Sequence, residues 1–78
     1  MSGPRHLVLT ARNKQVLRCI VDFHASHPYP AIVSDITKGL ELPREIVVYS
    51  LHKLVRMGYI DWIVEGRRTR AILPLHAA

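Results

Sequence analysis

The spacing of apolar residues along this chain changes once, at Gly58, and this change limits what the chain can fold into. Before Gly58 the apolar residues recur at intervals of three and four, as they do on one face of a helix. After it, residues 59–64 are rich in β-branched and aromatic side chains, which is typical of a strand. Since a two-stranded hairpin is not stable alone, the second part must pack on the first.

Three helices are predicted before Gly58. Thr10 has the hydroxyl that an N-cap needs, and Pro28 disfavours helix in the residue before it, so the two bracket the first helix. Gly39 is expected to end the second helix, and Pro43 suits the first turn of the third. The expected ranges are Ala11–Ser26, Ile32–Gly39 and Pro43–Met57.

A β-hairpin is predicted after Gly58. Glu65-Gly66-Arg67-Arg68 has the composition of a turn, with Gly where a positive φ is needed. The expected strands are Tyr59–Val64 and Arg70–Leu73, and Pro74 should end their pairing. Together the elements predict an α+β, mostly α, winged helix-turn-helix fold, with three helices followed by a two-stranded β-hairpin wing. We expect a flexible N-terminal arm over 1–8, the winged-helix domain over 9–75 and a short C-terminal tail over 76–78.

Apolar residues at matching intervals are expected to form one core. The residues that we expect to be buried together are Leu17, Ile20, Ile36, Leu40, Val47, Leu51, Leu54 and Ile60.

The charge of the chain limits its partners. The 78 residues carry a formal net charge of +5 and a pI near 10.0, which favours nucleic acid, an anionic membrane surface or an acidic protein. No apolar run approaches the ~20 residues of a membrane helix, so we expect no membrane partner. Met1-Ser2-Gly3-Pro4 lacks the apolar core of a signal peptide, and the single Cys19 cannot form an internal disulfide. We therefore expect a cytoplasmic protein.

Catalytic and metal-binding patterns are missing from the sequence. The five histidines and Cys19 lack the paired spacing of a metal site, and the carboxylates are scattered among basic residues. There is no phosphate-cradling glycine loop and no nucleophile motif. We expect no metal, no cofactor and no enzymatic activity, with Cys19 as a small packing residue.

The third helix has the residue types of a DNA-reading helix. Such a helix presents donors, acceptors and small apolar groups to the major groove. Arg44 can donate to guanine or to a phosphate, and Val48 can meet a thymine methyl group. The residues expected on its exposed DNA-binding face are Arg44, Glu45, Val48, Tyr49, His52 and Lys53. The alternative is a solvated helix face without a partner.

Three arginines cluster in the predicted wing. Arg67, Arg68 and Arg70 fall within four residues, and clustered positive charge binds the phosphate backbone through release of counterions. We therefore predict these three as DNA-binding residues that provide affinity independent of sequence. Two of the three should face the DNA, because alternate residues of a strand point to opposite sides. The alternative is a turn whose charges serve solubility only.

Two sets of residues follow the patterns of known families. The first set is Leu9-Thr10-Ala11-Arg12, Gln15-Val16-Leu17, Ile20, Ser34-Asp35-Ile36 and Leu40. It resembles the opening of the LexA-type repressor DNA-binding domain. The second set is Leu51, Leu54, Gly58 and Ile60, which resembles the winged-helix pattern of MarR-like regulators.

The resemblance implies a fold, but it does not imply a particular DNA sequence as the binding site. Pro43-Arg44-Glu45-Ile46 does not match the Ser-Pro-Asn-Ala run of LexA, so no operator sequence is implied. The sequence stops where a LexA-type repressor continues into a self-cleaving dimerisation domain, so no protease is implied either.

Two functions are compatible with these patterns. The first is a sequence-preferring transcriptional regulator that binds double-stranded DNA, with a homodimer as a candidate assembly. The second is a protein-interaction module without DNA binding, in which Val48, Tyr49 and Trp62 form an apolar patch. Salt dependence of duplex binding distinguishes them.

Overall fold

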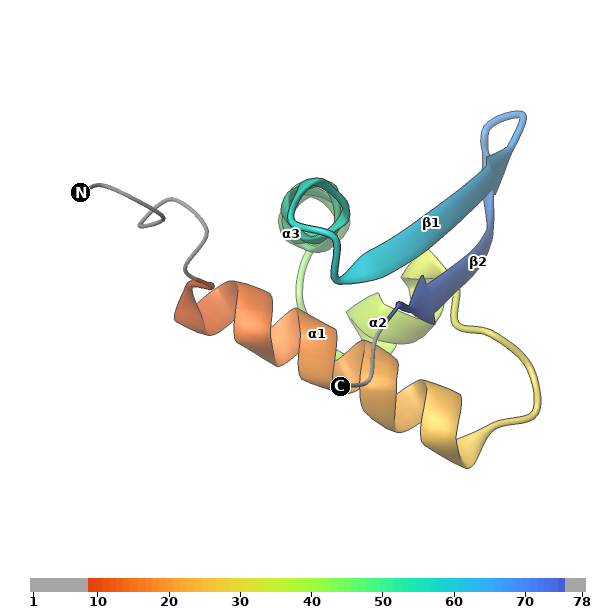
Figure 1. Ribbon diagram of the computed structural model, residues 1–78, viewed down its shortest axis with the longest axis horizontal. Coiled ribbons are helices and arrows are strands. Elements are labelled where there is room, and N and C mark those ends of the chain that lie inside the picture. Colours follow the sequence, from red (N-terminus) through yellow and green to blue (C-terminus); the bar gives the residue numbers. More distant parts are fainter. Residues whose placement is uncertain (1–8, 76–78) are drawn as a thin grey trace.

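The computed structural model describes residues 9–75, and its elements follow the predicted order. They are α1 (Ala11–Ser26), α2 (Val33–Leu40), α3 (Arg44–Arg56), β1 (Ile60–Glu65) and β2 (Arg68–Pro74). In Figure 1 the hairpin extends beyond the three helices, with its tip at the upper right. This arrangement confirms the α+β winged helix-turn-helix fold. The predicted arm at 1–8 and tail at 76–78 lie outside the described residues.

The bounds of α1 agree with the prediction. The Thr10 hydroxyl accepts a hydrogen bond from the Asn13 backbone N–H at 3.1 Å, as expected of an N-cap. At the other end, the His27 backbone N–H donates to the Phe23 carbonyl, and the following prolines carry the chain away from the helix.

The end of α2 corrects a prediction. Gly39 lies inside the helix, and Glu41 ends it in the left-handed conformation, with φ 56° and ψ 45°. A glycine is needed at position 39 for another reason, because a Cβ there would lie 3.3 Å from the Cys19 sulfur on α1. Gly39 therefore allows α1 and α2 to approach each other closely.

The third helix ends as predicted, at Gly58. This glycine has φ 82°, and its backbone N–H donates to the Val55 carbonyl. The Tyr59 backbone N–H donates to the Leu54 carbonyl, which completes a Schellman motif. Pro43 is the N-cap, so α3 itself begins at Arg44.

The hairpin is longer than predicted. Glu65 pairs with Arg68, so only Gly66 and Arg67 form the turn, and the predicted four-residue turn is too wide. Gly66 has φ 65°, as the sequence indicated. Ile63 pairs with Ala71 and Val64 with Thr69, which leaves Arg70 as the extra residue of a β-bulge.

The segment between α1 and α2 also joins the sheet. Ala31 forms an isolated antiparallel bridge with Ile72, whose backbone N–H donates to the Ala31 carbonyl at 2.8 Å. The base of β2 is therefore paired on both sides, with β1 and with Ala31, which lies two residues before α2.

The core contains most of the residues predicted for it. Leu17 and Leu40 are exceptions, since both are half-buried at its margin. Val16 lies at the centre of the α1 face in place of its neighbour Leu17. The buried apolar residues are Val16, Ile20, Ala31, Val33, Ile36, Val47, Leu51, Leu54, Ile60, Ala71 and Ile72. Among residues 9–75, no helix has the length and apolar character needed to cross a bilayer.

Candidate nucleic-acid interface

The buried face of α3 determines which of its side chains point outward. Val47, Leu51 and Leu54 are completely buried, so the predicted helical phase is correct. Arg44 and Glu45 are exposed in the first turn, and Tyr49 is 63% exposed one turn later. These three side chains therefore remain available to a ligand.

Two other predicted residues of α3 are less accessible. Val48 is half-buried and packs against the core, so much of its side chain is unavailable to a thymine methyl group. Lys53 is also half-buried, and its Nζ lies 5.4 Å from the centre of the Tyr49 ring. At this distance the ammonium group and the ring attract each other.

The side chain of His52 contacts the wing. Its ring lies edge to face against the Trp62 ring, with centroids 4.9 Å apart. Trp62 is half-buried on β1, and its indole N–H donates to the Thr69 hydroxyl on β2 at 2.9 Å. His52 is exposed on its other side, so it both supports the wing and faces solvent.

The wing arginines differ in their partners. Arg70, at the bulge, forms an exposed ion pair with Glu65, so part of its charge is already balanced. Arg67 and Arg68 are exposed at the tip. Among the described residues, no ion pair involves either of them.

A cleft of about 310 Å³ brings the two predicted sets of residues together. It lies between the first turns of α2 and α3 and the wing, and we call it the wing cleft. Its polar lining residues are Ser34, Arg44, Arg67, Arg68 and Thr69. Sequence reasoning did not predict Ser34 or Thr69 as site residues, although Ser34 belongs to the set of residues that resembles LexA-type repressors.

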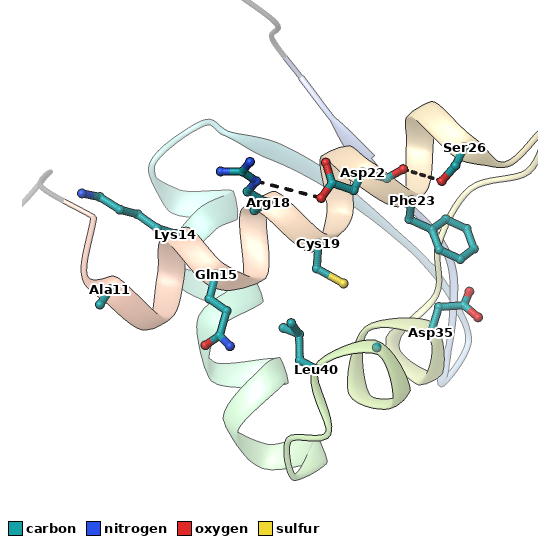
Figure 2. A pocket seen from close by; sticks show the side chains of 11 residues that line it. Ala11, Lys14, Gln15, Arg18, Cys19, Asp22, Phe23, Ser26, Asp35 and Leu40 are labelled. Carbon is teal, nitrogen blue, oxygen red and sulfur yellow. Dashed lines mark hydrogen bonds and ion pairs between the residues drawn. The ribbon is translucent and has the colours of Figure 1, made fainter.

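A second groove, of about 580 Å³, lies between α1 and α2 on another part of the surface. Figure 2 shows the Cys19 side chain projecting from α1 toward α2, into this groove. Burial and the carboxylates of Asp22 and Asp35 raise the pKa of this thiol above its ordinary value of 9.0. Within residues 9–75 the structure contains no cluster of three side chains suited to a metal ion.

The helices, the wing and the outward face of α3 define a winged helix-turn-helix domain. No family model matches the chain. Over 69 residues, or 87% of its length, the chain is 33% identical to a LexA repressor of Pseudothermotoga lettingae. The match covers 32% of that repressor, so the chain spans about a third of its length. The similarity confirms the resemblance to a LexA-type repressor.

Proposed function

We propose that this protein is a sequence-preferring transcriptional regulator that binds double-stranded DNA. In this proposal α3 enters the major groove and the basic wing contacts the backbone or the minor groove. The observation that carries the proposal is the wing cleft, because it joins Arg44 of α3 to Arg67 and Arg68 of the wing on one surface. The similarity to a LexA repressor supports the same function.

The proposed contacts to DNA are of two kinds, those to bases and those to the phosphate backbone. Glu45 can accept a hydrogen bond from a cytosine amino group, and the exposed Tyr49 can donate to a base or a phosphate. The wing arginines contribute affinity that does not depend on sequence. The residues proposed to contact DNA are Arg44, Glu45, Val48, Tyr49, His52, Lys53, Arg67, Arg68 and Arg70.

The regulator would act by occupying a promoter, without catalysis, in the cytoplasm. One small module buries only about 600–1,000 Å² against DNA, so tight binding usually needs a dimer or two adjacent sites. We therefore propose a homodimer on DNA.

The protein-interaction alternative is less well supported by the geometry. Its apolar patch would consist of Val48, Tyr49 and Trp62, but Val48 and Trp62 are half-buried. Only Tyr49 is well exposed, and one exposed aromatic ring is a small docking surface.

Titration with a random duplex at low and at moderate salt tests the proposal. We expect binding at low salt that weakens steeply as salt rises, because phosphates are neutralised. The double variant Arg67→Ala/Arg68→Ala should bind every duplex more weakly and with a shallower salt slope. Arg12→Ala/Arg18→Ala removes the same charge from exposed positions on α1 and is the matched control. Absence of binding at low salt, or equal loss in both double variants, contradicts the proposal.

A further inference from the structure

We propose that the wing cleft binds a single backbone phosphate of the duplex, held at once by α2, α3 and the wing. This inference rests on the proposed function and extends it to α2, which the sequence did not assign to the interface. It also decides between the two roles considered for Arg44. A guanidinium group that binds a phosphate is not available to bind guanine.

The charge of the wing cleft distinguishes it from two other grooves on the described surface. Arg44, Arg67 and Arg68 line it, and none of its described lining residues is acidic. The groove between α1 and α2 and a smaller groove along α1 both contain Asp22 beside their basic residues. Three guanidinium groups without a carboxylate form a site for an anion, and planar guanidinium groups suit phosphate oxygens well.

Uncharged donors complete the site. Ser34 lies in the first turn of α2, where the helix dipole favours an anion. The first backbone N–H groups of a helix lack a partner four residues earlier, and in α2 that of Asp35 donates to the Ile32 carbonyl instead. The Thr69 hydroxyl accepts from the Trp62 indole N–H, so its own O–H proton remains free to donate into the cleft. The acid of the same helix turn, Asp35, bonds the Ile32 backbone N–H and lines the groove on the other side of α2.

The size of the cleft fits this ligand. Its volume of about 310 Å³ is roughly ten times the ~30 Å³ share of one liquid water, which is enough space for a phosphate group. The wing cleft adjoins the exposed face of α3. A phosphate bound there would therefore fix the orientation of α3 in the major groove of the DNA.

A double-mutant cycle on duplex binding tests whether the arginines share one phosphate. Arg44→Ala and Arg67→Ala should each weaken binding about tenfold, as expected for a charge-assisted hydrogen bond. The double variant should bind within about threefold of either single variant, because the first change already releases the phosphate. Its salt slope should fall by about 0.9, the value for one phosphate.

Lys53→Ala provides the matched control for this cycle. Lys53 lies on α3 but does not line the wing cleft. In the double variant Arg44→Ala/Lys53→Ala, the two losses of duplex affinity should multiply, because the two side chains contact different phosphates. The salt slope should then fall by about 1.8. If the Arg44 and Arg67 effects multiply in the same way, the shared phosphate is disproved. If the wild type fails to bind any duplex at low salt, the proposed function itself has failed.

A second experiment tests the contribution of α2. Ser34→Asp puts a carboxylate into the wing cleft and should weaken duplex binding at least tenfold. Ser26→Asp makes the same change at the exposed end of α1, in the other groove, and should leave binding within about twofold. Equal effects would overturn the inference. Unfolding of each variant, followed by circular dichroism, shows whether a loss of binding comes from a loss of fold.

A free anion is distinguished from the DNA backbone by titration with inorganic phosphate. We expect the backbone amide signals of Ser34 and Arg44 to shift with phosphate and not with chloride at equal ionic strength. If phosphate shifts these signals but Arg44→Ala, Arg67→Ala and Ser34→Asp all bind duplex normally, the site takes free anions and the assignment to the DNA backbone is wrong.

Discussion

His52 on α3 and Trp62 on β1 pack edge to face, with ring centroids 4.9 Å apart and planes inclined at 62°. Through the Trp62 indole N–H this contact continues to Thr69 on β2. Three side chains therefore connect the proposed DNA-reading helix to both strands of the wing.

The first prediction concerns this contact. His52→Ala should cost about 0.5–1.5 kcal/mol of unfolding free energy, the range measured for aromatic pairs. Trp62 is the only tryptophan in the chain, so its fluorescence reports on the surroundings of this one ring. We expect a red shift of its emission in the variant, because water replaces the imidazole ring. Tyr49→Ala removes a well-exposed ring one turn away and should leave the emission unchanged.

The second prediction concerns the phase of α3. Leu51→Ala should destabilise the protein by about 2–5 kcal/mol, because it empties a completely buried site. Val55→Ala, at a position that is 40% exposed, should stay within about 0.5 kcal/mol of the wild type. Urea denaturation measures both values. Similar losses at the two positions would mean that Leu51 is not in the core.

The third prediction concerns the close approach of α1 and α2. Alanine is about 1 kcal/mol better than glycine inside a helix, but a Cβ at Gly39 would lie 3.3 Å from the Cys19 sulfur. Gly39→Ala should therefore stabilise the Cys19→Ala background by more than it stabilises the wild type. An identical change in both backgrounds would show that the sulfur does not limit residue 39.

The fourth prediction follows from the raised pKa of Cys19. The unfolded chain loses the thiol proton at a lower pH than the folded chain does. Above about pH 9 the unfolded state consequently binds fewer protons, and the free energy of unfolding falls as pH rises. Between about pH 8 and about pH 10 the wild type should lose more stability than Cys19→Ala, which lacks the thiol. Equal losses would show that folding leaves the pKa of the thiol unchanged.

The sequence predicted those features that depend on local chemistry. Thr10, Pro43 and Gly58 mark helix ends because hydroxyl capping, a fixed φ and a positive φ are properties of single residues. The spacing of Val47, Leu51 and Leu54 was sufficient to establish which face of α3 is buried.

Tertiary contacts explain what the sequence did not predict. Gly39 was assigned to a helix end because glycine often stands there. Its actual role is a close contact with Cys19, which lies far away along the chain and so leaves no local signal in the sequence. Ala31 gave no strand signal, since one bridge to Ile72 is its whole contribution to the sheet. The second strand begins two residues before its predicted start, because charged residues such as Arg68 can pair at the tip of a hairpin whose faces are both exposed.

The candidate site was only partly predictable for a related reason. Arg44, Arg67 and Arg68 were identified by charge, but their shared cleft depends on how the tertiary fold places the wing beside the first turns of α2 and α3. Ser34 and Thr69 have common, uncharged side chains, and only their position beside these arginines makes them candidates.

The bulge at Arg70 separates the wing into two parts that can change independently. Nearer the helices, pairing runs from Ile60–Pro74 to Ile63–Ala71, and the Ala31 bridge and buried Ile60 and Ile72 fix it. Beyond the bulge, the pairs at Val64 and Glu65 follow a register offset by one residue. An exchange of the outer loop should therefore leave the inner pairs in place, so the affinity proposed for its arginines can be altered without disturbing the base of the wing.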